Sequence, residues 1–235
     1  MQTVILAGGL ATRLRPLTDD IPKSMIRVNG RPFLEYQLEL LRENGVHDIV
    51  LCVGHLSRMI EAYFGDGDRF GVNISYSDEG ENLLGTAGAL KRAEPLLENQ
   101  FFLLYGDSYL PFDYQAIWSY SSRYPGFCIL TVHRNHNRYD NSNVAVADGL
   151  VSVYDKSNPG RRLIHIDAGL SVLWKEFLSR IPSNQPSPLE DLYQDIIGQK
   201  KMLAYEVRRR FHEIGSPRGL IDFGKLVRSE PALAG

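Results

Sequence analysis

Apolar runs and helical periodicity alternate along the first half of the chain. Short apolar runs predict strands over residues 4–7, 47–53, 72–76 and 101–105. Between these runs, apolar side chains recur at helical spacing over residues 32–44, 57–64 and 86–97. This alternation is typical of an α/β fold in which a mostly parallel sheet carries helices on both faces.

The pattern changes after about residue 125, where predicted strands follow one another without intervening helices. The strands are predicted over residues 127–132, 144–146, 150–153 and 163–173. Ala147, Asp148 and Gly149 have the composition of a hairpin turn. The polar stretch 182–188 predicts an exposed loop, and residues 217–227 predict a closing helix.

Length and composition fit one domain with a mixed, mostly parallel sheet. The chain has 235 residues, of which 43% are hydrophobic, so a sizeable core is expected and disorder is not. A net charge of −2 argues against a general nucleic-acid or membrane-surface binder. We expect a single domain over residues 1–235, with halves at about 1–125 and 126–235.

The two cysteines, Cys52 and Cys128, lie in apolar runs. We interpret both as reduced, buried side chains, because the sequence has neither a disulfide framework nor a cysteine-rich metal pattern. The N-terminal segment has no basic flank and no long apolar stretch, so neither a signal peptide nor a transmembrane span is predicted. We therefore expect a cytoplasmic protein.

The most informative segment follows the first predicted strand and reads LAGGLATRLRPLT over residues 6–18. Gly8 and Gly9 permit backbone N–H groups to approach a phosphate closely. Thr12 adds a hydroxyl, Arg13 offers a planar fork of donors, and Lys23 is a further cation within reach. The structural alternative is a glycine turn followed by surface cations.

A second motif ends the predicted strand at residues 101–105, where Gly106 and Asp107 follow. In open α/β sheets, ligands bind beyond the carboxyl ends of the strands. A carboxylate at that place can hold Mg²⁺ against phosphate oxygens. The alternative is that Asp107 forms a turn or caps a helix.

Together these motifs resemble the signature of the sugar-1-phosphate nucleotidyltransferases, G-G-x-G-T-R-L-x-P-L-T followed by P-K-P. The resemblance extends to about Phe223 and is greatest to short bacterial guanylyltransferases that act on mannose or heptose 1-phosphate. Ala11 stands in place of the third glycine, which removes no charge, and Ser24 replaces the second proline. The resemblance implies a Rossmann-like fold of the nucleotide-diphospho-sugar transferase type, with a nucleotide-binding first half and a sugar-phosphate-binding second half.

The resemblance assigns catalytic roles to Arg13, Lys23 and Asp107. In the family the arginine and lysine neutralise the reacting phosphates and the leaving pyrophosphate, and the aspartate binds the metal. Residues 211–217, FHEIGSP, resemble D-I-G-T-P, which makes Glu213 the second metal ligand beside Asp107. Ser216 in this segment is also suited to cap the final helix, and the two roles are compatible.

A loop rich in small residues opens the helix predicted at 86–97, after acidic residues that include Glu79. The family recognises the nucleobase here, and the run LGTAG at 84–88 favours a guanylyltransferase. Close packing of the helix through Gly85 and Gly88 explains the small residues equally well. The complete nucleotide-binding set implied is Leu6, Ala7, Gly8, Gly9, Thr12, Glu79, Gly85 and Thr86.

The second half supplies the residues that the resemblance assigns to the sugar phosphate. Asp155 and Lys156 resemble an E-K pair whose lysine holds the phosphate, and residues 167–169 resemble a sugar-contacting N-A-G. Aspartate at position 167 only accepts hydrogen bonds, which would favour a sugar that offers hydroxyl donors. The implied set is Gly106, Asn143, Asp155, Lys156, Asp167, Gly169 and Glu190, although Glu190 could equally cap a helix after Pro188.

We therefore predict a Mg²⁺-dependent enzyme that joins a nucleoside triphosphate, with GTP favoured, to a heptose or mannose type of sugar 1-phosphate. The alternatives are a uridylyltransferase for a sugar such as N-acetylmuramate 1-phosphate, a non-catalytic homologue that senses sugar nucleotides, and a cytidylyltransferase for a small alcohol phosphate. No aromatic box for a quaternary ammonium supports the last of these. Apart from the substrates, we expect no nucleic-acid or membrane partner, and a homo-oligomer is left open.

Overall fold

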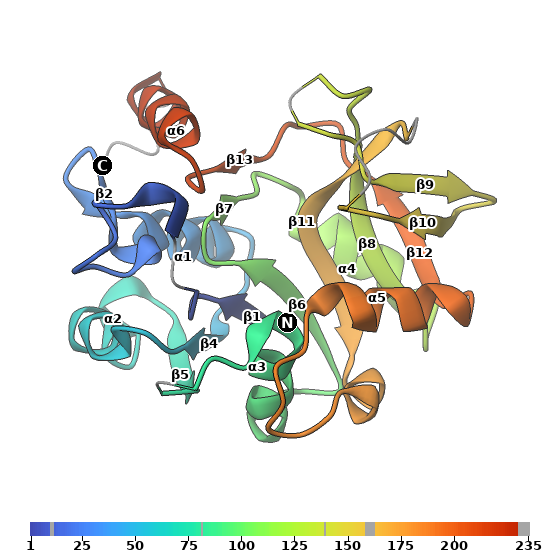
Figure 1. Cartoon of the computed structure of the whole chain (residues 1–235), viewed down its shortest axis with the longest axis horizontal. Coiled ribbons are helices and arrows are strands. Elements are labelled where there is room, and N and C mark those ends of the chain that lie inside the picture. The colour runs from blue at the N-terminus through green and yellow to red at the C-terminus, as the bar shows by residue number, and fades with distance from the viewer. Residues whose placement is uncertain (10–11, 81, 139, 158–162, 230–235) are drawn as a thin grey trace.

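The computed structural model describes residues 1–9, 12–80, 82–138, 140–157 and 163–229 (Figure 1). The described part is built around one nine-stranded sheet. Its strands are β1 (Gln2–Leu6), β4 (Asp48–Val53), β5 (Asn73–Asp78), β6 (Gln100–Tyr105), β8 (Cys128–Arg134), β9 (Val144–Ala147), β10 (Leu150–Tyr154), β11 (His165–Trp174) and β12 (Met202–Glu206). Across the sheet they follow the order β5-β4-β1-β6-β11-β8-β12-β10-β9.

The strands β5, β4, β1 and β6 form the parallel part of the sheet. Leu6, the last residue of β1, lies in register between Cys52 and Tyr105. Strands β1, β4 and β6 are buried along almost their whole length, as expected where helices cover both faces. Because the strands are parallel, the segments that follow β1 and β6 emerge at the same edge.

Helices cover both faces of the sheet (Figure 1). They are α1 (Phe33–Glu43), α2 (Ser57–Phe64), α3 (Gly85–Ala93), α4 (Tyr114–Ser122), α5 (Leu189–Gly198) and α6 (Pro217–Ser229). Leu38 of α1 belongs to the core that α2 and α4 share, and Leu90 of α3 and Ile196 of α5 belong to the core of the other face. α6 packs apart from both through Phe223, whose ring meets that of Phe33 edge-on at 5.0 Å.

The sheet becomes mixed in the second half of the chain. β11 runs antiparallel to both β6 and β8, β12 runs parallel to β8, and β10 lies antiparallel between β12 and β9. Asp148 and Gly149 adopt positive φ values of 52° and 77° between β9 and β10, as the predicted hairpin turn requires. The predicted α/β class, with a mixed sheet flanked by helices, is confirmed.

Some elements differ from the sequence prediction. The apolar pattern does not single out α4, although Asp113 is its N-cap and accepts from the Ala116 backbone N–H at 2.9 Å. Strand β12 is likewise not predicted, and α5 is anticipated only as a helix after Pro188. The helix predicted over residues 86–97 ends at Ala93, and the 3-10 turn η4 (Glu94–Leu96) follows because Pro95 has no N–H for the α-helical bond.

The remaining elements of the described part are short. They are the 3-10 turns η1 (Thr12–Leu14), η2 (Lys23–Met25), η3 (Asp68–Phe70) and η5 (Lys175–Arg180), and the strand pairs β2 (Arg27–Val28) with β3 (Arg31–Pro32) and β7 (Ser108–Tyr109) with β13 (His212–Glu213). The antiparallel β7–β13 pair brings the C-terminal segment back to the end of β6.

Cys52 and Cys128 are both free and buried, as predicted, and burial raises the pKa of each thiol to about 12. Within the ranges that the structure describes, no helix combines the length and the apolar character needed to cross a bilayer.

Candidate active site

Two adjoining hollows open beyond the ends of β1 and β6. The first, which we call the large cleft, has a volume of about 860 Å³ and is lined mainly by charged and polar side chains. The second, the small pocket, has a volume of about 220 Å³ and is lined mainly by glycines and apolar side chains. Lys23, Tyr105 and Asp107 line both hollows, so the two share one boundary.

The glycine loop begins in the small pocket. Residues 6–9 all line it, and the Ala7 N–H donates to the Cys52 carbonyl at 2.8 Å, which continues the β1–β4 ladder. A Cβ on Gly8 would lie 2.6 Å from Oε1 of Glu79 and 3.3 Å from the backbone N of Gly54. Glycine is therefore required at position 8 for the Glu79 carboxylate to approach the loop so closely.

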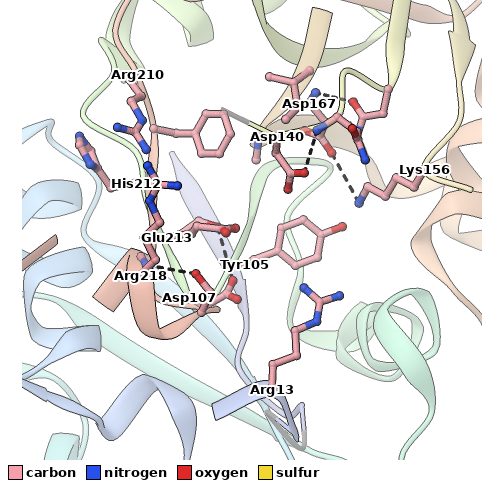
Figure 2. Close-up of a pocket in the computed structure, with 18 of the residues that line it drawn as sticks. Arg13, Tyr105, Asp107, Asp140, Lys156, Asp167, Arg210, His212, Glu213 and Arg218 are labelled. Carbon is pink, nitrogen blue, oxygen red and sulfur yellow. Dashed lines mark hydrogen bonds and ion pairs between the residues drawn. The ribbon is translucent and has the colours of Figure 1, made fainter. Parts of the chain in front are cut away.

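The loop then turns toward the large cleft. Thr12 and Arg13 belong to η1, and both line the large cleft. Figure 2 shows the Arg13 side chain reaching up into the cleft toward Tyr105. Ala11, which replaces a glycine of the family signature, lies outside the described residues.

Lys23, Asp107 and Glu213 converge at the boundary of the two hollows. Lys23 Nζ donates to Asp107 Oδ2 at 2.9 Å. The Ile214 N–H donates to the Asp107 carbonyl at 2.9 Å beside the β7–β13 pair, which brings Glu213 to the same place. A Cβ on Gly215 would lie 3.0 Å from Asp107 Oδ2 and 4.0 Å from both Glu213 Oε2 and Lys23 Nζ, so the three charged groups surround one point.

The Asp107 and Glu213 carboxylates fit a hard divalent cation. Burial raises the pKa of Glu213, Asp107 and Asp140 raise it further, and Lys23 and Arg13 oppose the rise. A bound cation would offset the repulsion between these carboxylates. Among the described ranges, no group of three or more His, Cys, Asp or Glu side chains is arranged to hold a metal, so further ligands would come from phosphates or water.

Glu79 also lines the small pocket and is only 9% exposed. Its Oε2 accepts from the Leu84 N–H at 2.7 Å, which closes the loop before α3. Burial raises the pKa of the Glu79 carboxyl, and the Leu84 hydrogen bond partly opposes that rise. Gly85 and Thr86, at the start of α3, line the same pocket.

Close packing explains the small residues of this helix start. A Cβ on Gly85, whose φ is +70°, would lie 2.8 Å from the Ser187 carbonyl oxygen. A Cβ on Gly88 would lie 2.9 Å from the Gln185 carbonyl oxygen. The packing alternative therefore holds for both glycines, and only Gly85 also lines the small pocket. Most of the predicted loop 182–188 is exposed, but Ser187 is half-buried against α3.

Lys156 lies on the far wall of the large cleft (Figure 2). Its Nζ is 3.3 Å from Glu190 Oε1 and 3.9 Å from Asp167 Oδ2. The same ammonium lies 5.4 Å from the ring centroids of both Tyr105 and Tyr154, within range of a cation–π contact. Two carboxylates and two aromatic rings thus surround the Lys156 ammonium.

Asp167 is the buried centre of this wall, with a side chain only 6% exposed. Its Oδ2 accepts from the Tyr154 hydroxyl at 2.8 Å, and its Oδ1 accepts from the Gly169 N–H at 2.8 Å. Asn143 Oδ1 accepts from the Asp167 N–H at 2.8 Å. Both carboxylate oxygens already have protein donors, so sugar hydroxyls would share these acceptors with Tyr154 and Gly169.

The structure brings most predicted residues to one of the two hollows. The large cleft contains Thr12, Arg13, Lys23, Asp107, Asn143, Asp155, Lys156, Asp167, Gly169 and Glu213. The small pocket contains Leu6, Ala7, Gly8, Gly9, Lys23, Glu79, Gly85, Thr86, Gly106 and Asp107. Gly106, expected on the sugar-phosphate side, lines the small pocket because its backbone packs against Leu6 and Ala7. Glu190 joins the site through its ion pair with Lys156.

Other residues of the large cleft are not predicted from the sequence. They include Tyr105, Arg138, Asp140, Arg210, Arg218 and Asp222. The arginine run 208–210 just before the FHEIGSP segment is a signal that points to one of them. His212, whose role the sequence leaves open, lines the large cleft as well. Its pKa is lowered mainly by burial and further by the positive charge of Arg210. Figure 2 shows Arg210, His212 and Glu213 on the wall opposite Asp167 and Lys156.

Comparisons with known proteins bear on this site. The family model described as "Nucleotidyl transferase" matches residues 2–141. The chain is 31% identical over 224 residues to the D-glycero-alpha-D-manno-heptose 1-phosphate guanylyltransferase of Campylobacter jejuni subsp. jejuni serotype O:2, covering 95% of this chain and 98% of that protein. It is 41% identical over 126 residues to the N-acetylmuramate alpha-1-phosphate uridylyltransferase of Neisseria meningitidis serogroup B, covering 53% of this chain and 54% of that protein.

A solved structure agrees with these sequence relatives. The structure of HddC from Yersinia pseudotuberculosis complexed with GMP-PN has a TM-score of 0.78 and 26% identity to this chain. The likeness covers 96% of this chain and 98% of that protein.

Proposed function

The chain belongs to the nucleotidyl transferase family, and from this premise we propose that it transfers a nucleotidyl group from a nucleoside triphosphate to a sugar 1-phosphate. The products are a nucleoside diphosphate sugar and pyrophosphate. One observation carries the proposal: an apolar pocket and a charged cleft meet at Lys23 and Asp107. A base in the small pocket and an acceptor phosphate at Lys156 would bring their reacting phosphates together at this boundary.

The reaction we infer is an in-line displacement. A phosphate oxygen of the sugar 1-phosphate forms a bond to the α-phosphorus, while the bond from that phosphorus to the oxygen bridging to the β-phosphorus breaks and pyrophosphate leaves with its electron pair. The acceptor phosphate is already an anion near pH 7, so no strong general base is required. Positioning and charge neutralisation carry the catalysis, and Arg13, Lys23 and Lys156 contribute protein charges.

We propose that Asp107 and Glu213 hold a Mg²⁺ ion. Asp107 follows β6, and Glu213 comes from β13. The repulsion between their carboxylates, with Lys23 paired to Asp107, supports this assignment. When bound, the ion supplies positive charge that stabilises the charge developing on the phosphate oxygens. Lys23 lines both hollows, so its ammonium would also contact phosphate oxygens bound at their boundary.

For the donor we infer GTP, and for the acceptor a heptose or mannose type of sugar 1-phosphate. The relative that supports this choice is a guanylyltransferase and matches along nearly its whole length. Glu79 in the small pocket offers acceptor oxygens of the kind that guanine donors require. The second candidate is uridylyl transfer to N-acetylmuramate 1-phosphate, which the relative with 41% identity over 126 residues favours.

Pyrophosphate release across substrate pairs tests the proposal. ATP, CTP, GTP and UTP would each be combined with D-glycero-α-D-manno-heptose, mannose, glucose and N-acetylmuramate 1-phosphates, with the Asp107→Ala variant as the blank. We expect release above the blank with GTP and the heptose or mannose ester. Release with UTP and the N-acetylmuramate ester would instead establish the second candidate. Sugar-nucleotide binding without turnover of any pair would contradict both and establish a sensing homologue.

A further inference from the structure

One short segment connects the small pocket to the far wall of the large cleft. Residues 185–190 run along the start of α3, where the Ser187 carbonyl accepts from the Ala87 N–H at 2.9 Å and from the Gly88 N–H at 3.3 Å. The Ser187 N–H donates to the Leu84 carbonyl at 2.8 Å. The absence of side chains at Gly85 and Gly88 makes this approach feasible.

The side chain of Thr86 makes the last contact of this series. Its Oγ1 accepts from the Leu189 N–H at 2.7 Å. Leu189 is the first residue of α5, and Pro188 before it provides no side-chain cap. The Thr86 hydroxyl therefore satisfies a backbone donor that helix geometry leaves without an intrahelical partner. Thr86, which lines the small pocket, thus contacts the first residue of α5.

The next residue along α5 reaches the acceptor site. Glu190 Oε1 lies 3.3 Å from Lys156 Nζ, and the two side chains are 39% and 38% exposed. A half-exposed ion pair is normally weak, because holding two long side chains in one geometry is entropically unfavourable. An anchored helix start reduces that penalty for Glu190. One turn later, Gln194 Nε2 donates to the backbone carbonyl of Tyr154, and the ring of Tyr154 lies beside the Lys156 ammonium.

We propose that Thr86 is a positioning residue for the acceptor phosphate: its hydroxyl fixes the start of α5, and Glu190 then holds Lys156 where that phosphate binds. The proposal rests on the proposed function for its kinetic consequences, but its geometric part does not. It assigns the Thr86 hydroxyl to the acceptor side of the reaction, although the residue itself lines the base pocket.

The decisive variant is Thr86→Val, which keeps the shape of the side chain and removes the acceptor for the Leu189 N–H. Thr86→Ser restores that acceptor. Ser187→Ala is the matched control in the same segment, since its hydroxyl lies 3.4 Å from the Gln185 carbonyl and takes no part in the backbone bonds to α3. Each protein would be compared by amide hydrogen exchange over residues 185–195 and by the rate at which acetic anhydride labels Lys156, followed by mass spectrometry. Labelling of Lys91 is the internal reference. Lys91 lies on α3, and its Nζ is 2.6 Å from Oε2 of Glu94, which follows the end of that helix.

We expect Thr86→Val to speed amide exchange at the start of α5 and to raise labelling of Lys156 at least threefold. Glu190→Gln should raise labelling of Lys156 by a similar factor. In Thr86→Val, the KM for the acceptor D-glycero-α-D-manno-heptose 1-phosphate should rise about fivefold, while the KM for GTP changes less than twofold. Thr86→Ser and Ser187→Ala should match the parent protein in labelling and exchange.

Unchanged labelling of Lys156 in Thr86→Val would overturn the proposal, and so would a rise confined to the KM for GTP. Absence of turnover in the parent protein would contradict the proposed function alone, because labelling and exchange still decide whether Thr86 positions Lys156.

Discussion

Lys23 Nζ lies 2.9 Å from Asp107 Oδ2, although the two residues are 84 positions apart in the chain. The register of the sheet produces this contact. Leu6 at the end of β1 pairs with Tyr105 at the end of β6, and the two strands are parallel. The glycine loop and the Gly106-Asp107 motif therefore leave the sheet at one edge, where Lys23, in the η2 turn that follows the loop, meets the Asp107 carboxylate.

The Asp107–Glu213 pair predicts dependence on a divalent ion. Chelation by EDTA should abolish pyrophosphate release, and Mg²⁺ or Mn²⁺ should restore it. Asp107→Ala should lower kcat by at least ~10²-fold, because loss of a metal ligand removes several kcal/mol of transition-state stabilisation. Undiminished turnover in EDTA would rule out this role for the two carboxylates.

Glu213 should also destabilise the metal-free protein at neutral pH. Its pKa is raised in the folded state above the ordinary value of 4.5, so folding disfavours its ionised form. This penalty is absent below the ordinary pKa and grows as pH rises through the folded-state pKa. Glu213→Gln should therefore raise Tm at pH 8 in EDTA, and the difference should vanish near pH 4. Because Glu213 is exposed, solvent screening should keep this rise small. A lower Tm for the variant at pH 8 would contradict this account of the carboxylate.

The cations of the large cleft should divide by substrate. Arg13 lies in the glycine loop, which we propose binds the triphosphate, so Arg13→Ala should mainly lower kcat through the leaving pyrophosphate. Lys156 lies on the far wall, so Lys156→Ala should raise the KM for the sugar 1-phosphate more than the KM for the triphosphate. Arg15→Ala is the matched control, because Arg15 is 59% exposed and paired with Asp19. Equal effects of Lys156→Ala on both KM values would refute the division.

If the small pocket binds the base as proposed, it should favour GTP over UTP, dTTP, CTP and ATP. Guanine presents N1–H and N2–H₂ donors on one edge, whereas uracil presents one donor between two acceptors. An acceptor left unpaired in a buried site costs about 1–3 kcal/mol, which corresponds to roughly tenfold to a hundredfold discrimination. Glu79→Gln should reduce the ratio of kcat/KM for GTP to that for UTP by about tenfold. A parent enzyme with kcat/KM for UTP equal to or above that for GTP would exclude guanylyl specificity.

The sequence predicts the parts of the site that lie next to strand ends. Gly8 and Asp107 follow apolar runs within two residues, and Arg13 lies further along the same loop as Gly8. Local pattern and loop chemistry therefore make them candidates, and the resemblance to the family assigns their roles. Arg138 and Arg210 escape prediction because they reach the large cleft from segments whose course depends on packing over long distances. No spacing along the chain reveals that a residue from either segment will line the large cleft.

Thr86 shows a different limit of sequence reasoning. The composition of LGTAG predicts either a base site or close packing, and the structure shows close packing of this segment beside the small pocket. Gly88 packs against the Gln185 carbonyl without lining the small pocket, whereas Gly85 and Thr86 take part in both. The partner segment lies about a hundred residues away, as the 103-residue separation of Thr86 and Leu189 indicates, so no local rule could select it.

The ladder between β6 and β11 has a mechanical consequence. It runs from Leu104 opposite Leu170 to Gln100 opposite Trp174 and joins the parallel and mixed parts of the sheet by backbone hydrogen bonds. The two halves therefore cannot rotate about a hinge without breaking that ladder. We expect enclosure of the substrates to come from η1 and α6, which lie outside the sheet, so the overall dimensions of the molecule in solution should hardly change when both substrates bind.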